Sequence, residues 1–200
     1  MALLCLYINC FSQKINIEPY YIGDRVPDLQ LTKLVNYKDS VAKLSSFGHK
    51  LIILDFWGVH CGSCVTMFPL EDSLQKIFKD DVQFILVTTD STGKVAAFLK
   101  DWNAKHKTTL ELPVITEDGL LRRLFRHYYV PHYAWLAPDG SLLAQTLDYF
   151  INKETIRNAL LSVKKNEQHL KEKNFPKDMF RFKQPGRKQV SQFTQTQNQK

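Results

Sequence analysis

Residues 51–64 read Leu-Ile-Ile-Leu-Asp-Phe-Trp-Gly-Val-His-Cys-Gly-Ser-Cys, and this stretch decides the fold. Its first half is apolar on both faces apart from one aspartate, which is typical of a central strand that is covered on both sides. Two cysteines separated by two residues come next, at the start of a helical stretch that extends to about Phe78. The sequence therefore predicts a buried strand that leads a cysteine pair into a helix.

The position of Cys61-Gly62-Ser63-Cys64 indicates what the pair does. At a helix N-terminus, free backbone N–H groups and the positive end of the dipole favour a thiolate. A cysteine pKa of about 8.5 can fall to about 3.5–7.5 in such places. We expect Cys61 to attack a substrate disulfide and Cys64, one turn further in, to resolve the mixed disulfide. The histidines lack the spacing of zinc ligands, so we predict no metal and no cofactor besides this redox-active disulfide.

Three further residues support the pair. Asp55 lies within the buried strand, where its pKa would rise and suit it to move protons to and from Cys64. The alternative for Asp55 is a core-edge aspartate with satisfied hydrogen bonds. Pro69 lies inside the helical stretch, where it removes a backbone bond and kinks the helix. Val130-Pro131 directly precedes a strand-like run, an awkward place for proline.

The rest of the chain alternates strand-like and helix-like stretches, which indicates an α/β fold with a mixed sheet. The helix after the cysteines is expected to bury one apolar face, made of Leu70, Leu74, Ile77 and Phe78. The strand interrupted by Pro113 is expected at a sheet edge. Strands are predicted within 23–31 and at 41–44, 82–88, 110–115, 132–136 and 141–147, and helices after 91–93, after 117–119 and from about 152.

These motifs resemble the thioredoxin superfamily in order and spacing, namely Asp55-Phe56-Trp57, Cys61-Gly62-x-Cys64, Pro69 and Val130-Pro131. Residues 23–44 and the helix–strand unit between 91 and 115 look more like the exported TlpA-like branch. The resemblance covers about residues 23–163. It implies a thioredoxin fold, a mixed central sheet flanked by helices, with an N-terminal strand extension and an inserted helix–strand unit.

The resemblance also implies roles for single residues. Asp55 would be the buried acid, and Pro131 would be cis and lie beside the cysteines. Val130, Pro131, Trp57 and His60 would contact the substrate. In this family the partners are disulfide-containing exported proteins, and a membrane thiol carrier supplies the reductant; we expect a monomer with the same partners.

The chain departs from the family pattern at three positions near the cysteines. Met67 stands where cytochrome-maturation members have a glutamate, which argues against an apocytochrome substrate. His60 stands where thioredoxin has tryptophan, and its imidazole either stabilises the thiolate or faces solvent. Ser63 replaces a proline, so with Gly62 it is expected to return a backbone N–H near the sulfur and to make the pair less reducing.

Two other functions compete with a protein disulfide reductase. Peroxiredoxins share the fold, but their Pro-x-x-x-Thr/Ser-x-x-Cys pattern is absent, because Leu54 and Gly58 occupy the matching places. A non-catalytic client-binding module would not need both cysteines. Reduction is favoured over oxidation or isomerisation, because Asp55 would help deprotonate the resolving thiol.

The two ends of the chain differ in character from the middle. Residues 1–12 are predicted to be a signal peptide, although no Lys or Arg precedes the apolar run; the alternatives are a fold-edge strand or a lipid-anchor cysteine at Cys10. Residues 13–22 form a short N-terminal segment, 23–165 the thioredoxin-like domain, and 166–200 the helix end and a basic, Gln-rich disordered tail. The net charge is +7, much of it from this tail, so no nucleic-acid partner is predicted. We expect an exported protein of the periplasm or cell envelope, with membrane association as an option.

Overall fold

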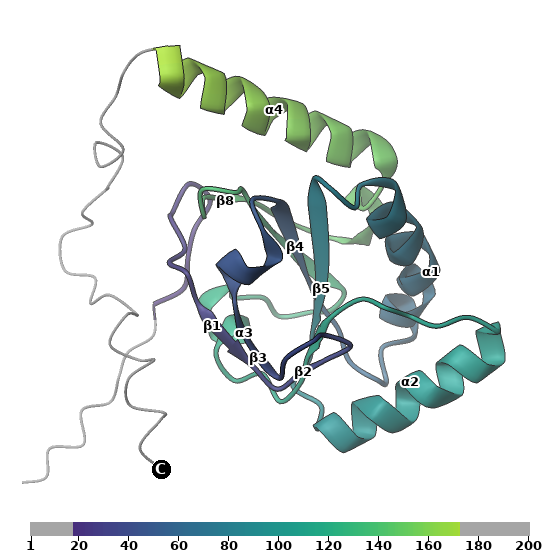
Figure 1. Cartoon of the computed structure of the whole chain (residues 1–200). Coiled ribbons are helices and arrows are strands. Elements are labelled where there is room, and N and C mark those ends of the chain that lie inside the picture. Colours follow the sequence, from purple (N-terminus) through teal and green to yellow (C-terminus); the bar gives the residue numbers. More distant parts are fainter. Residues whose placement is uncertain (1–17, 173–200) are drawn as a thin grey trace, which may run out of the picture.

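The computed structural model describes residues 18–172, and its centre is a six-stranded mixed sheet. The strand order is β2-β6-β5-β4-β7-β8 (Figure 1). The predicted α/β architecture with a mixed sheet flanked by helices is thereby confirmed. The signal peptide predicted for residues 1–12 and most of the predicted tail lie outside the described residues. The sheet strands are β2 (Leu34–Val35), β4 (Leu51–Phe56), β5 (Val82–Val87), β6 (Val114–Ile115), β7 (His132–Leu136) and β8 (Leu142–Thr146).

Strand β4 lies in the middle of the sheet, parallel to β5 and antiparallel to β7. All six of its residues are buried, as the apolar run predicts. Because side chains alternate along a strand, Leu51 and Ile53 pack into one core and Ile52 and Leu54 into a second core on the opposite face. Asp55 belongs to the same set as Leu51 and Ile53, so it points into the first core.

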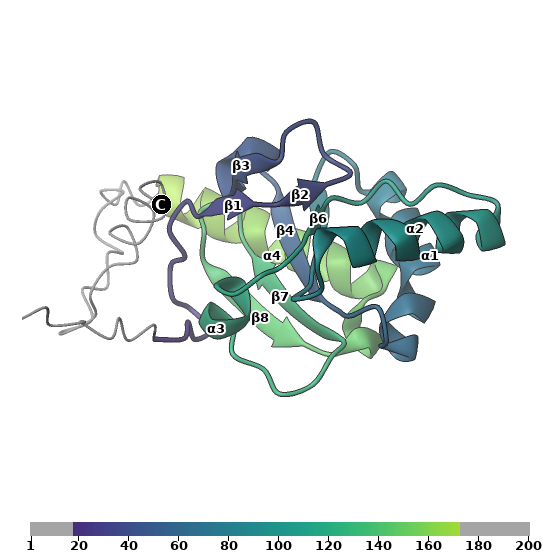
Figure 2. The same ribbon diagram turned by 90° about the horizontal axis from the view of Figure 1, so that it is seen from below.

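Different elements cover the two faces of the sheet. The first core receives side chains from α1 (Gly62–Ile77), α2 (Thr92–His106) and α4 (Lys153–Glu172). The second core lies under a two-stranded sheet of β1 (Gln30–Thr32) and β3 (Val41–Lys43), with η1 (Leu44–Phe47) and α3 (Leu121–Leu124). Figures 1 and 2 show α1 and α2 on one side of β4 and β5, with β1 and α3 on the other. A short helix, η2 (Asp148–Phe150), links β8 to α4.

Two details of the predicted secondary structure were wrong. Leu70 and Ile77 are exposed, and the face of α1 that turns inward carries Cys64, Phe68, Glu71 and Leu74 instead. The strand near Pro113 is only two residues long and is not at the edge, because β2 pairs with β6 on its outer side. The pairing of β2 was not predicted, since two residues are too few to show a period in sequence.

The turn between β7 and β8 follows the prediction at Pro138-Asp139-Gly140. Gly140 has a φ of +88°, and a Cβ added there would lie 2.6 Å from the carbonyl oxygen of Val26. The turn therefore requires glycine for its backbone conformation and for the approach of the N-terminal segment.

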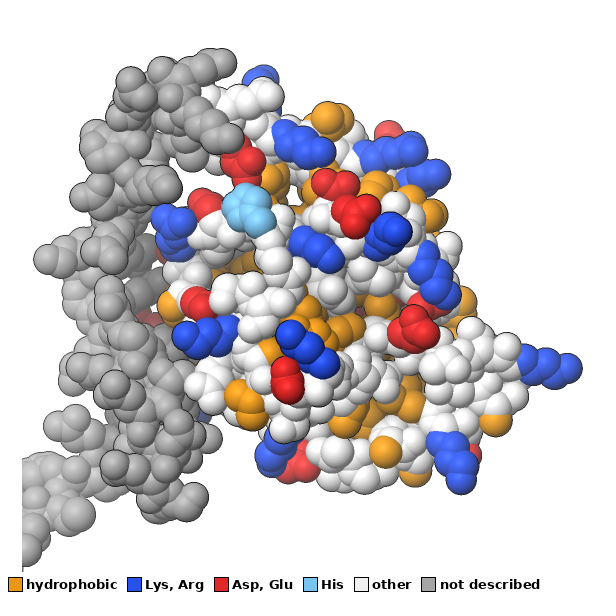
Figure 3. All heavy atoms as spheres, viewed as in Figure 1, with side chains coloured by type: hydrophobic (Ala, Val, Ile, Leu, Met, Phe, Trp, Pro, Cys, Tyr) orange, Lys and Arg blue, Asp and Glu red, His pale blue; other side chains and the backbone are white. Residues whose placement is uncertain are grey.

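The surface carries charges of both signs. On the face shown in Figure 3, Lys and Arg side chains lie among Asp and Glu side chains rather than in one basic patch. Within residues 18–172, no helix has the length and the apolar composition that crossing a membrane requires.

Candidate active site

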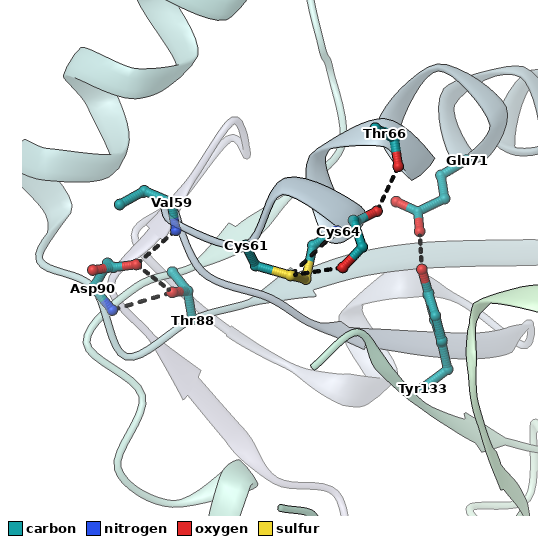
Figure 4. Close-up of a disulfide and its surroundings, with 9 residues drawn as sticks. Val59, Cys61, Cys64, Thr66, Glu71, Thr88, Asp90 and Tyr133 are labelled. Carbon is teal, nitrogen blue, oxygen red and sulfur yellow. Dashed lines mark hydrogen bonds between the residues drawn. A yellow bond between two sulfur atoms is a disulfide. The ribbon is translucent and has the colours of Figure 1, made fainter. Parts of the chain in front are cut away.

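Cys61 and Cys64 form a disulfide at the start of α1 (Figure 4), with their Cα atoms 5.3 Å apart. Cys61 is the N-cap residue, and its sulfur accepts a hydrogen bond from the Cys64 N–H at 3.2 Å. The Ser63 hydroxyl lies 3.5 Å from the same sulfur. Cys61 is half-buried whereas Cys64 is completely buried, so a reagent from solvent reaches Cys61 first.

Asp90 holds the loop that leads into the pair. Its carboxylate accepts hydrogen bonds from the Val59 N–H at 2.9 Å and from the Thr88 hydroxyl (Figure 4). It also accepts one from the Lys94 ammonium at 2.7 Å. Partial burial would raise the pKa of Asp90, but the bonds from Lys94, Val59 and Thr88 outweigh burial and lower it. Sequence reasoning missed Asp90. Its position shortly after β5 could have indicated it. The C-terminal ends of the parallel strands β4 and β5 meet at one edge of the sheet, so a residue after β5 can lie near the loop that follows β4.

Asp55 is completely buried, and neither of its oxygens has a hydrogen-bond partner among the described residues. Burial raises the pKa of this carboxyl well above its ordinary value, and the negative charge of Glu71 raises it further. The alternative of an aspartate with satisfied hydrogen bonds is therefore not what the structure contains. A buried carboxyl with a raised pKa can hold and release a proton near neutral pH.

Glu71 is a second buried acid, and sequence reasoning missed it. The Tyr133 hydroxyl donates a hydrogen bond to its Oε1 at 2.7 Å (Figure 4). Burial raises the pKa of Glu71 from 4.5 to about 7, against the lowering effect of that bond. Burial and the nearby carboxyls also raise the pKa of Tyr133, so its hydroxyl keeps its proton and remains a donor. The spacing in the sequence could have indicated its burial. Glu71 follows Cys64 by two helical turns, so it lies on the same face of the helix as that cysteine.

The Val130–Pro131 bond is cis, as the resemblance implied. The next residue, His132, pairs with Phe56 at the end of β4, from which the loop to the cysteines departs. Val130 is 39% exposed. Together with Trp57 it lines a hollow of about 170 Å³ next to this loop. Other residues around the hollow include Gly58, Thr88, Arg122, His127, Tyr128 and Tyr129.

The remaining predicted site residues differ in exposure. Trp57 is buried, and its ring meets Phe68 edge-on with centroids 5.0 Å apart. His60 is exposed, and the polar contacts to the Cys61 sulfur come from Ser63 and Cys64. Gly62 is the exposed first residue of α1, and Pro69 lies inside that helix. In the part of the chain that the structure describes, no group of three or more His, Cys, Asp or Glu could hold a metal ion.

Comparison with known sequences places these features among redox proteins. The AhpC/TSA family matches residues 22–159. The thiol-disulfide oxidoreductase ResA of Geobacillus kaustophilus is 24% identical over 116 residues, which cover 58% of this chain and 62% of ResA. The thioredoxin-like protein CDSP32 of Arabidopsis thaliana chloroplasts is 34% identical over 77 residues, which cover 38% of this chain and 24% of CDSP32. The chain thus matches less than two thirds of the length of either relative.

Solved structures share the fold. A thiol:disulfide interchange protein DsbE from Chlorobium tepidum superposes with a TM-score of 0.57 at 26% identity, over 72% of this chain and 97% of that protein. The reduced 2-Cys peroxiredoxin of Plasmodium vivax has the same TM-score of 0.57 at 15% identity, over 76% of this chain and 99% of the peroxiredoxin. The second likeness shows the fold alone.

Proposed function

Because the chain belongs to the AhpC/TSA family and has the thioredoxin fold, we propose that it is a thiol–disulfide oxidoreductase that reduces disulfides in exported proteins. One observation carries this proposal: a disulfide at a helix start joins an accessible Cys61 to a buried Cys64. The buried acid Asp55 points into the core that contains Cys64. This arrangement supplies an attacking sulfur, a resolving sulfur and a proton acceptor.

The proposed reaction moves two electrons from the cysteine pair to the client. The Cys61 thiolate attacks one sulfur of a client disulfide, which forms a mixed disulfide and releases the first client thiolate. Cys64 loses its proton to the buried acid and attacks the Cys61 sulfur. The bond to the client breaks, the second client thiolate leaves, and the Cys61–Cys64 disulfide forms. A dithiol donor then reduces this disulfide and restores the starting state.

The hollow beside Val130 is the proposed position of the client chain. It adjoins the loop that leads to Cys61, and the exposed rings of Tyr128 and Tyr129 offer it apolar contact area. We place the reaction in the periplasm or cell envelope and assign the reductant to a membrane thiol donor. The support for this location is the apolar run at residues 1–8.

A trapping experiment tests the proposal. With Cys64→Ser, the mixed disulfide on Cys61 cannot be resolved from within, so exported proteins should accumulate on it covalently. The matched control is Cys61→Ser, which should trap almost nothing because Cys64 is buried. Trapping of equal amounts by both variants would contradict the assigned order of attack, and so would alkylation of Cys64 before Cys61 in the reduced protein.

Peroxide is the second candidate substrate, because a 2-Cys peroxiredoxin shares the fold. A peroxidase needs only the attacking sulfur for its first step, whereas a reductase needs both cysteines to release its client. We expect Cys64→Ser to lose insulin reduction and wild type to consume peroxide slowly. Rapid peroxide consumption that survived Cys64→Ser would replace the reductase proposal by a peroxidase.

A further inference from the structure

Two carboxyl groups are buried in the core that contains Cys64, and three elements bring them together. Asp55 comes from β4 and Glu71 from α1, and both are completely buried. Tyr133 lies directly opposite Asp55 on β7 and donates its hydroxyl to Glu71 at 2.7 Å. Among the described residues, that hydroxyl is the one donor found for the pair, since both Asp55 oxygens and Glu71 Oε2 have no hydrogen-bond partner.

The surroundings of the pair do not neutralise two negative charges. In residues 18–172, no Lys, Arg or His forms an ion pair with either carboxyl. The Tyr133 hydroxyl contacts the pair, and the charge of Asp148 in η2 acts on Tyr133, whereas Cys64 lies in the same core. Two ionised carboxylates buried in one core without cations are strongly unfavourable. Two negative charges on this pair are therefore unfavourable, which favours a state in which the pair keeps one proton.

Asp55 lies near the end of β4 from which the chain runs to the cysteines, and Glu71 lies further along α1. Cys64, Phe68 and Glu71 form one buried stripe of α1, and seven residues of helix span about 10 Å along the axis. Glu71 is thus too distant to contact the Cys64 sulfur. Asp55 points from the neighbouring strand into the same core, two residues before Trp57 and the loop to Cys61. The link from Glu71 toward the cysteines is its electrostatic effect on Asp55.

We propose that Glu71 is a positioning residue that shares one proton with Asp55 and thereby sets the pH at which Asp55 accepts the proton of Cys64. This inference rests on the proposed thiol–disulfide exchange. In the resolving step, the Cys64 proton moves to the singly charged pair, which becomes neutral, and the sulfur attacks Cys61. The client leaves as a thiolate, so the step needs no further reactant. When a dithiol donor later reduces the disulfide, the pair returns the proton to Cys64.

The test follows the resolving step alone. Reduced protein is mixed with 5,5′-dithiobis(2-nitrobenzoate) in a stopped-flow instrument. The first release of thionitrobenzoate reports attack by Cys61, and the second reports resolution by Cys64. In wild type, the rate of the second phase should rise with pH as the pair loses one proton. Glu71→Gln keeps an acceptor for Tyr133 but removes the carboxyl that shares the proton, so Asp55 must ionise alone and the midpoint should rise by about one pH unit or more.

Two further variants separate this role from a structural one. Tyr133→Phe removes the donor that stabilises the charged pair, so its midpoint should rise. Asp72→Asn removes a carboxylate from the same helix, where it faces Lys76 at the surface, and should leave the midpoint unchanged. A rise of the midpoint in both Glu71→Gln and Tyr133→Phe, with the first phase unchanged and Asp72→Asn like wild type, is not expected from a general loss of packing.

The outcomes distinguish this inference from the proposed function. If wild type shows both phases but Glu71→Gln has the midpoint of Asp72→Asn, the role of Glu71 is overturned and the oxidoreductase proposal stands. If wild type shows no second phase, the oxidoreductase proposal itself fails. Carboxyl ¹³C NMR of the oxidised wild type gives a measurement without any variant. Two independent titrations at ordinary carboxyl values would overturn the shared proton.

Discussion

Replacing Glu71 by glutamine should stabilise the protein at alkaline pH and do much less at acidic pH. The substitution keeps the size of the side chain and an oxygen that accepts the Tyr133 hydroxyl. It removes a carboxyl that must either keep its proton or be ionised without solvent. Its effect on the free energy of unfolding therefore depends on pH, which distinguishes it from a change in packing.

The magnitude follows from the pKa of Glu71. In the unfolded chain this carboxyl ionises near 4.5, whereas burial raises its pKa to about 7 in the folded protein. As pH rises between these values, the unfolded state releases the proton and the folded state keeps it, so stability falls. The full loss above pH 7 corresponds to about 3 kcal/mol, since each pKa unit is worth about 1.4 kcal/mol. Glutamine does not titrate and escapes this loss.

Urea unfolding of the oxidised proteins at pH 4.5 and pH 8 measures the effect. The gain of Glu71→Gln over wild type should be larger at pH 8 by about 2–3 kcal/mol. Taking the difference between the two pH values removes any constant effect of the substitution on packing. Asp72→Asn, on the same helix, is the matched control. A gain that stays the same at both pH values, or shrinks as pH rises, would refute the reasoning.

Leu74→Ala, in the buried stripe of α1, should lower the free energy of unfolding by about 2–5 kcal/mol, whereas Ile77→Ala on its exposed face should change it by less than about 0.5 kcal/mol. Equal losses in urea would contradict the assigned face. His127 stacks on His132 with ring centroids 4.6 Å apart, and burial lowers both pKa values below 6.5, so acidification should destabilise the fold. His127→Phe should reduce the drop in melting temperature between pH 7 and pH 5, and an undiminished drop would argue against this cause. Asp90→Ala should speed amide exchange in the loop before the cysteines and lower stability by about 1–3 kcal/mol; unchanged exchange at the Val59 amide would show that the loop does not need this acceptor.

Local patterns predicted the parts of the site that depend on neighbours in sequence. The apolar run of β4 and the cysteine pair after it are both short-range signals, so the buried strand and the helix start followed from them. Asp55 could be assigned to the core because it interrupts that run. The cis bond before Pro131 depended on the family resemblance, since proline alone seldom indicates it.

The parts that were missed depend on contacts between distant residues. The sequence did not single out Glu71, because charged residues are seldom fully buried, whereas Leu70 and Ile77 were predicted to face inward because they are apolar. Only the Tyr133 hydroxyl, from a strand far along the chain, makes burial of that glutamate understandable. The edge position predicted for the strand near Pro113, which is β6, was wrong for a similar reason. Its outer neighbour β2 has only two residues and could not be predicted from sequence.

The central place of β4 also has a consequence for the order of events during synthesis. One neighbour of this strand, β7, begins only at His132, well after both cysteines have left the ribosome. Until then β4 has an open side, and the core that shields Cys64 is incomplete. In a nascent chain both thiols are therefore exposed to a similar extent. The difference in exposure between Cys61 and Cys64 develops only when the last strands join the sheet. An oxidant that meets the chain in that interval can modify the inner cysteine, which the finished fold protects.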